Sequence, residues 1–153
     1  IGQGEEWDYA KELNSIIKEN HLESKVFFIS GGIDDRQLLG LYRNAELFIL
    51  TPEEENHHFE GFGIVYLEAA ASGLPIVASK NSGAESAVGD NFNGILVLQN
   101  NPEIAASAIL KILENQDIKT RFSDNSREWA KNFSWDKIVK KYIEIYHEKV
   151  KHY

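Results

Sequence analysis

Short runs of apolar and β-branched residues alternate with longer helix-forming segments along this chain of 153 residues. Four such runs, KVFFIS, ELFILT, PIVAS and GILVL, occupy residues 25–30, 46–51, 75–79 and 94–98. Runs that are apolar throughout are typical of strands buried on both faces of a sheet. Strands that are separated by helices pair in parallel, because each connection must cross over the sheet. The sequence therefore predicts an α/β fold with a doubly wound parallel sheet in one domain.

The segments around these runs repeat their apolar residues every three or four positions, which is the period of an amphipathic helix. Trp7, Ala10, Leu13 and Ile17, for example, share one face of the first segment. We expect the tryptophans in such stripes to belong to the core rather than to form platforms for a sugar. The helices are expected over residues 5–20, 34–44, 62–72, 102–115, 117–132 and 135–150, with a turn and a short helix over 81–88.

The chain is acidic, with a formal net charge of −8, and it contains no cysteine. Binding to phosphates needs clustered Lys and Arg, so we expect no nucleic-acid partner. Basic residues do gather near the end of the chain, where we favour a solvated helix face over a membrane patch. Without cysteine there is no disulfide and no thiolate metal site, which fits a cytoplasmic protein. No apolar run approaches the roughly 20 residues that cross a bilayer, and no signal peptide is visible.

The chain has no methionine, not even at position 1, so we expect it to be part of a longer protein. Ile1 would then be the last residue of a strand, and Gly2 and Gly4 would form the turn that follows. The sheet is accordingly expected to lack part of its first strand.

Two glutamates, Glu60 and Glu68, stand eight positions apart in the glycine-rich stretch FEGFGIVYLEAAASGLPIVAS. A hydrolytic pair of carboxyl groups would need to lie about 5–9.5 Å apart. Eight helical positions rise roughly 12 Å, so this spacing disfavours a glycosidase. A metal site would need further ligands, and the adjacent His57 and His58 point opposite ways in an extended segment. We therefore expect solvated loop histidines and no metal.

An extended polar ligand that lies across the start of the helix would suit both glutamates. In a parallel sheet the loops after Ser30, Leu50 and Ser79 share the edge where ligands bind. Unpaired N–H groups at a helix amino end attract phosphate, and glycine lets the backbone approach closely. A carboxylate repels phosphate, so each glutamate would accept hydrogen bonds from hydroxyl groups instead. A diphosphate between two hydroxyl-rich ends describes a nucleotide-diphosphate sugar.

The stretch EGFGIVYLEAAASGLPIVAS closely resembles the E-x7-E signature of retaining glycosyltransferases of the GT-B architecture, family four, also described as glycosyl transferases group 1. The flanking segments IGQGEE, VFFISGGIDDRQLLGLYRNAELFILTP and SGAESAVGDNFNGILV resemble further segments of this family. The resemblance covers essentially the whole chain, but it matches only the family's C-terminal half. It implies that residues 1–153 form a Rossmann-like donor-binding domain and that the N-terminal acceptor domain is absent from this sequence.

Carried over by position, the resemblance implies that Glu60 is the catalytic residue, beside the donor sugar. Glu68 would hold the ribose hydroxyl groups, residues 61–64 would meet the sugar and diphosphate, and residues 31–33 would pack against the base. The implied donor-binding set is Glu68, Gly61, Phe62, Gly63, Ile64, Gly31, Gly32, Ile33, Gly2 and Gly4.

The resemblance also implies which cations are absent. The Arg and Lys that neutralise the diphosphate in the family would precede Ile1. Lys80, Arg43 and Arg36 are candidates to replace them, although we favour surface roles for all three.

The activity that the resemblance implies is transfer of a sugar, with retention, from a nucleotide-diphosphate sugar to a glycan or lipid-linked acceptor. No metal or other cofactor is implied, and the chain would be inactive without its N-terminal domain. Peripheral membrane contact would come through the full-length protein. Two alternatives remain open, a non-catalytic nucleotide-binding regulatory module and a GT-B-type sugar-nucleotide epimerase.

Overall fold

The computed structural model describes residues 5–29, 32–53 and 61–150, with the backbone alone at both ends of this set, residues 5–8 and 149–150. Its internal contacts divide the chain into two compact units, residues 1–34 and 35–153. The strand end expected at Ile1 lies outside the described residues.

The first unit contains one helix, α1 (Glu5–Glu19), which confirms the helix expected there. The helix ends in a left-handed turn, because His21 has a φ of 55°. The amide of Leu22 donates to the carbonyl of Ile17 (2.9 Å), and the amide of His21 donates to that of Lys18 (3.1 Å). This pair of bonds is the Schellman motif, which satisfies carbonyls at the end of a helix.

The strand expected over residues 25–30 is wrong for the residues that are described. Residues 26–29 form no strand, and their side chains are 39–78% exposed. A strand exists only where a neighbouring strand accepts and donates its backbone hydrogen bonds. The apolar, β-prone composition of this segment therefore does not suffice to place it in a sheet.

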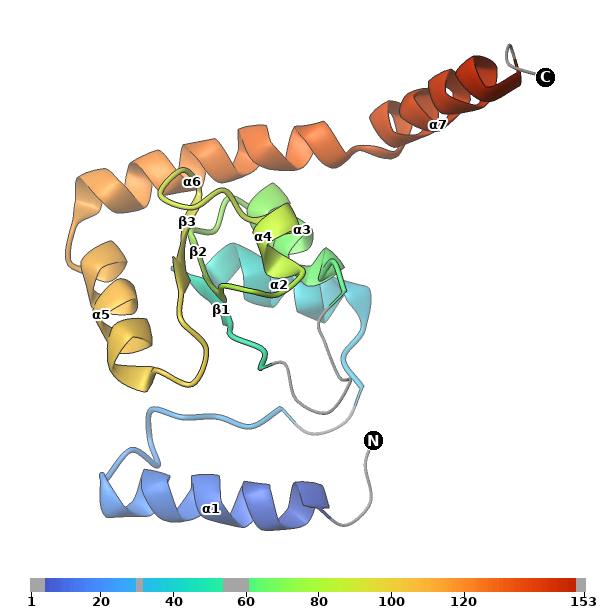
Figure 1. Ribbon diagram of the computed structural model, residues 1–153. Coiled ribbons are helices and arrows are strands. Elements are labelled where there is room, and N and C mark those ends of the chain that lie inside the picture. Colours follow the sequence, from blue (N-terminus) through green and yellow to red (C-terminus); the bar gives the residue numbers. More distant parts are fainter. Residues whose placement is uncertain (1–4, 30–31, 54–60, 151–153) are drawn as a thin grey trace. The chain divides into compact units, whose positions relative to one another are not determined.

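The second unit is built on a parallel sheet of three short strands, β1 (Phe48–Leu50), β2 (Ile76–Ser79) and β3 (Gly94–Val97). The strands are hydrogen-bonded in the order β1-β2-β3, and both pairs are parallel (Figure 1). The three strands fall within the apolar runs that predicted them. The parallel α/β architecture is thus confirmed.

Helices surround this sheet, and their positions agree with the periodicity of the sequence to within a few residues. They are α2 (Asp35–Asn44), α3 (Ile64–Ala71), α4 (Ala84–Ala87), α5 (Pro102–Leu113), α6 (Gln116–Ala130), the 3₁₀ turn η1 (Lys131–Phe133) and α7 (Trp135–Val150). Side chains of Asn101 and Asn115 cap α5 and α6, each accepting a backbone N–H at 3.0 Å.

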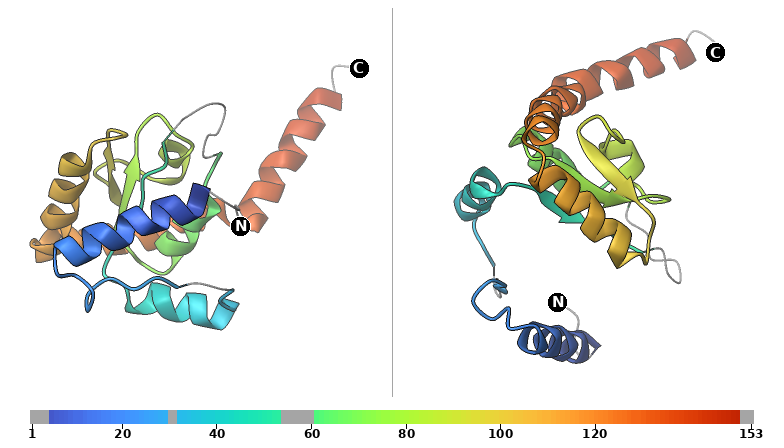
Figure 2. Two further views of the ribbon diagram at one scale, coloured as in Figure 1. Left: turned by 90° about the horizontal axis from the view of Figure 1, so that it is seen from below. Right: turned by 90° about the vertical axis from the view of Figure 1, so that its left-hand side faces the viewer.

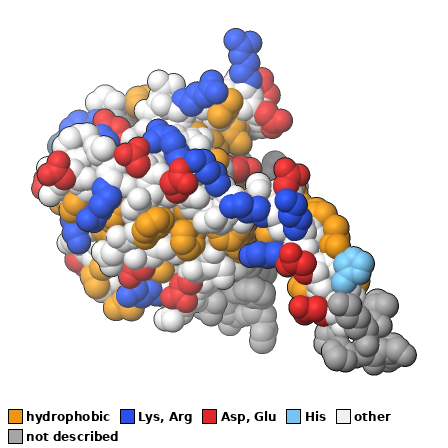
Figure 3. Space-filling view, turned by 90° about the horizontal axis from the view of Figure 1, so that it is seen from above, with side chains coloured by type: hydrophobic (Ala, Val, Ile, Leu, Met, Phe, Trp, Pro, Cys, Tyr) orange, Lys and Arg blue, Asp and Glu red, His pale blue; other side chains and the backbone are white. Residues whose placement is uncertain are grey.

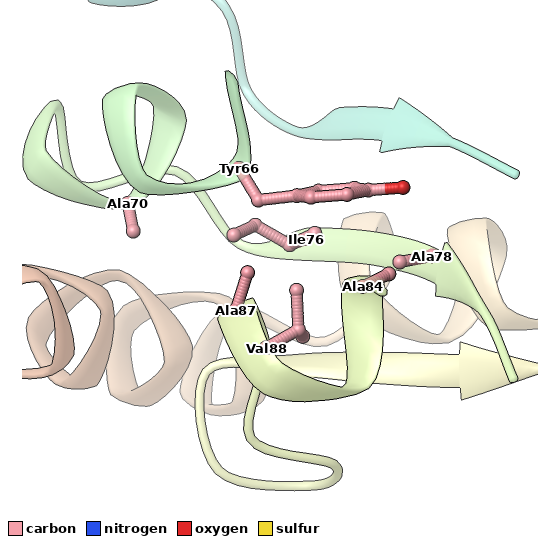
Figure 4. Close-up of a cluster of buried hydrophobic side chains, with 7 residues drawn as sticks. All are labelled: Tyr66, Ala70, Ile76, Ala78, Ala84, Ala87 and Val88. Carbon is pink, nitrogen blue, oxygen red and sulfur yellow. The ribbon is translucent and has the colours of Figure 1, made fainter. Parts of the chain in front are cut away.

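Strand β2 separates two apolar layers, because its side chains point alternately to opposite faces. Ile76 and Ala78 face α3 and α4, where they pack with the side chains that Figure 4 labels. Val77 faces the other way, against Ile112 of α5 and Phe122 of α6. In the right-hand view of Figure 2, α5 accordingly lies in front of the sheet.

Helix α7 departs from the expectation that its apolar residues are buried. Trp135 is 81% exposed, Tyr142 is 61% exposed and Tyr146 is 68% exposed. The expected core role of Trp135 is therefore wrong in this structure. The spacing of apolar residues predicted which face of the helix they share, but not what covers that face.

The surface of α6 and α7 carries exposed Lys and Arg side chains that alternate with acidic ones (Figure 3). Arg127 pairs with Asp124 and Lys131 pairs with Glu128. These ion pairs are typical of a solvated helix face. The solvated face expected for the basic residues near the end of the chain stays a prediction. Among the helices that are described, none is long and apolar enough to span a bilayer.

Replacing Ile112 with alanine is expected to lower the free energy of unfolding by about 2–5 kcal/mol, because it opens a cavity between α5 and the sheet. Ile112 is fully buried, whereas Leu110 on the same helix is 51% exposed. Urea unfolding of the two alanine variants measures the difference. Equal losses for Ile112→Ala and Leu110→Ala would contradict this packing.

Candidate donor-binding site

The glycine-led start of α3 is the centre of the candidate site. Gly63 is the N-cap and has a φ of 70° and a ψ of 70°, a left-handed conformation that glycine adopts without strain. No side chain caps the helix at this position. The first N–H groups of a helix have no carbonyl partner within it. A Cβ added at Gly61 would meet nothing within 4 Å, so the backbone there is open to close approach.

Two buried hydroxyl groups organise the carboxyl edge of the sheet, one holding the start of α3 and the other holding the loop after β1. The hydroxyl of Tyr66, in the first turn of α3, donates to the carbonyl of Leu50 at the end of β1 (2.9 Å). The hydroxyl of Ser79, at the end of β2, donates to the carbonyl of Pro52 (2.7 Å). The loops after Leu50 and Ser79 thus share one edge, as predicted.

Glu68 lies one turn further along α3, with an exposed side chain. The hydroxyl of Tyr42, on α2, donates to Oε2 of Glu68 at 3.1 Å. Burial of the tyrosine, assisted by the hydrogen bond and the negative charge of Glu68, raises the pKa of Tyr42 to about 12. The hydroxyl therefore remains a hydrogen-bond donor to Glu68 at neutral pH.

A groove of about 610 Å³ runs beside this carboxylate. Its wall is mostly apolar, and its residues come from α3, the residue Phe62 before it, the end of α6, η1 and α7. The lining residues are Phe62, Ile64, Leu67, Glu68, Ala71, Ala130, Phe133, Trp135, Ile138 and Tyr142. Phe62 and Ile64 of the predicted set are thus brought together with Glu68.

Of the other predicted residues, Gly61 and Gly63 lie at the start of α3, and the rest are not brought into this arrangement. The expected catalytic residue, Glu60, lies outside the described residues, as do Gly31, Gly2 and Gly4. Gly32 and Ile33 are described in the first unit, and a Cβ at Gly32 would meet nothing within 4 Å. The candidate site is therefore built from the second unit alone.

The three candidate cations occupy different places. Lys80 directly follows β2 at the carboxyl edge, where its amide donates to the carbonyl of Val97 (2.7 Å). Arg43 lines a separate pocket of about 260 Å³ together with Gly73 and Leu74, which precede β2. Arg36 is exposed on α2. Of these cations, Lys80 is the one that lies at the same edge of the sheet as the start of α3.

No group of three or more carboxylate or imidazole side chains that could hold a metal occurs in the described part of the chain.

Sequence reasoning missed the contact between Tyr42 and Glu68. The available signal was a tyrosine on the inward face of a helix, since a buried phenol usually finds a hydrogen-bond partner.

Comparison with known proteins identifies the class. Residues 1–129 match the family described as glycosyl transferases group 1. The chain is 30% identical over 147 residues to an uncharacterized glycosyltransferase of Methanocaldococcus jannaschii, covering 95% of this chain and 35% of the relative. It is 36% identical over 116 residues to D-inositol 3-phosphate glycosyltransferase of Salinispora arenicola, covering 76% of this chain and 25% of the relative.

Solved structures agree with these relatives. Anabaena HepE in complex with UDP-glucose superposes with a TM-score of 0.76 at 28% identity, over 95% of this chain and 38% of that one. The C-terminal domain of a glycosyl transferase group 1 family protein from Francisella tularensis gives 0.70 at 25% identity, over 82% of this chain and 62% of that one. The chain therefore belongs to the glycosyl transferases group 1 family, has its Rossmann-like fold, and corresponds to the C-terminal domain. It spans about a third of the length of the M. jannaschii relative.

The contact between Tyr42 and Glu68 has a consequence at alkaline pH. The raised pKa means that the unfolded chain ionises this tyrosine near pH 10, whereas the folded chain retains the proton to about pH 12. The stability that Tyr42 contributes is therefore complete below pH 10 and is lost as the pH rises toward 12.

Urea unfolding of the native chain and of Tyr42→Phe, compared at neutral pH and above pH 10, measures this loss. The difference between their free energies of unfolding should shrink as the pH rises. A difference that stays constant across this range would contradict the raised pKa.

Proposed function

We propose that this chain is the donor-binding domain of a retaining glycosyltransferase and binds a nucleotide-diphosphate sugar. The observation that carries the proposal is the uncapped, glycine-led start of α3 at the carboxyl edge of a parallel sheet, with the exposed Glu68 one turn away. Ligands of open parallel sheets bind at this edge.

The two parts of the site suit different parts of the donor. Backbone N–H groups and the partial positive charge at the start of α3 favour the diphosphate. The carboxylate of Glu68 only accepts hydrogen bonds. It therefore suits the ribose hydroxyl groups, which can donate them, and not the phosphate oxygens, which cannot. The UDP-glucose complex of HepE supports a donor of this class.

The chemistry assigned to Glu60 rests on its position in the motif. It directly precedes Gly61, in the segment that leads to the start of α3 at Ile64. Beside the reacting carbon its negative charge would favour the positive charge that develops on the sugar. The leaving diphosphate would be stabilised by the start of α3, whose dipoles are fixed before the reaction begins.

We propose that the acceptor binds to an N-terminal region outside this chain, which covers 35% of the M. jannaschii relative. We propose that residues 1–153 act as one donor-binding domain and that transfer to a glycan or lipid-linked acceptor needs this further region. No metal or other cofactor is part of the proposal, and a cytoplasmic location with peripheral membrane contact of the full-length protein goes with it. The family assignment favours sugar transfer over a purely regulatory role.

Replacing Glu68 with alanine should weaken the binding of UDP or GDP by about tenfold or more, since a hydrogen bond to a charged group is worth about 1.5–3 kcal/mol. Calorimetric titration measures the affinity. Amide signals of residues 61–64 should shift in the native chain when the nucleotide is added.

The matched control is Glu103→Ala, which removes an exposed glutamate from α5 on the other side of the sheet. This variant should bind as the native chain does. Equal affinities of Glu68→Ala and the native chain would remove the role of Glu68, and no binding of either nucleotide at millimolar concentration would refute the proposed function.

The 153-residue chain alone should transfer no sugar, because the acceptor would be bound by the other domain. A chain extended by the N-terminal region should form product whose anomeric configuration is that of the donor, which proton NMR of the product determines. Turnover by the 153-residue chain would contradict the assignment of the acceptor to another domain. A product of inverted configuration would contradict the retaining mechanism.

A further inference from the structure

A row of aromatic rings holds Tyr42 in place between α2, β1 and α3. The side chain of Tyr42 is 9% exposed. Its ring lies 6.0 Å from that of Phe48, which in turn lies 5.9 Å from that of Tyr66 in an edge-to-face arrangement. Contacts of this kind fix the orientation of a ring. This packing therefore fixes the position of the Tyr42 hydroxyl beside α3.

The partner of this hydroxyl is unusual for a buried tyrosine. Tyr66, from the same row, donates to a backbone carbonyl, that of Leu50 (2.9 Å). Tyr42 instead donates to the exposed carboxylate of Glu68 (3.1 Å), 26 positions away in the sequence. An exposed glutamate otherwise samples several rotamers, and it loses that freedom when a ligand binds.

We propose that Tyr42 is a positioning residue, whose hydroxyl holds Oε2 of Glu68 so that the carboxylate presents its remaining lone pairs to the ribose hydroxyl groups of the donor. This inference rests on the proposed function. A carboxylate that is already oriented loses less rotamer freedom when the nucleotide arrives, which increases affinity. Because the pKa of Tyr42 is raised to about 12, the donor hydrogen is retained throughout the neutral range.

The experiment compares UDP and GDP with their 2′-deoxy forms, because the preference for ribose reports on Glu68 and not on the diphosphate. Calorimetric titration gives this preference for the native chain, Tyr42→Phe, Glu68→Ala and the double variant. The native chain should prefer ribose by about tenfold or more, as expected for a hydrogen bond to a charged group.

Tyr42→Phe should reduce that preference about threefold or more, because Glu68 is no longer held in one orientation. Its affinity for the deoxy nucleotide should stay within about twofold, because the start of α3 is unchanged. Glu68→Ala should abolish the preference, and adding Tyr42→Phe to it should change nothing further. Tyr146→Phe, which removes the hydroxyl of a tyrosine that is 68% exposed on α7, is the control and should bind as the native chain does.

A second variant tests the same contact without altering the tyrosine. Glu68→Asp keeps a carboxylate but withdraws it by one methylene from the Tyr42 hydroxyl, so its ribose preference should fall toward that of Glu68→Ala. If Tyr42→Phe or Glu68→Asp keeps the native preference while Glu68→Ala loses it, the positioning role is overturned and the proposed function stands. If the native chain binds nucleotide without a ribose preference, the positioning role is overturned and nucleotide binding stands. If it binds neither nucleotide, both are overturned.

Discussion

Burial of β2 on both faces is the constraint on which the second unit depends. Ile76 and Ala78 point to one face of the sheet and Val77 points to the other, and all three are fully buried. The neighbouring strand can approach only because position 94 is glycine, since a Cβ there would collide with the carbonyl of Ile76. This close parallel pairing fixes the carboxyl ends of β1, β2 and β3 at one edge. The hydroxyl of Tyr66 then binds the start of α3 to the end of β1, and the hydroxyl of Ser79 binds the loop after β1 to the end of β2.

The parts of the fold that could be read from the sequence are those set by local pattern. The 3.6-residue repeat gave the helices, and continuous apolar runs gave β1, β2 and β3. The same rule failed for residues 26–29, since a strand depends on a hydrogen-bonding neighbour that composition does not specify. Trp135 is a similar case, because a helical stripe predicts a shared face but not the surface that covers it.

The sequence predicted only part of the candidate site, because contacts between distant segments do not follow from local pattern. Gly63 and Glu68 belong to one continuous motif, so their spacing on α3 followed from helix geometry. The contact between Tyr42 and Glu68 joins two helices and depends on the ring packing of Phe48 between them. Nothing local to Tyr42 shows which carboxylate its hydroxyl will reach. The position of Lys80 at the carboxyl edge, by contrast, followed from the sequence, since Lys80 directly follows a predicted parallel strand.

The left-handed backbone of Gly63 restricts which residue can stand at this position, whereas the positions on either side are not restricted in this way. Any residue with a Cβ would be strained at this φ of 70°. Its neighbours Phe62 and Ile64 are 36% and 66% exposed, so their side chains can change without disturbing the apolar layers. If the site binds a donor sugar as proposed, variation in sugar preference would come from the side chains on either side of Gly63, whose backbone conformation favours glycine.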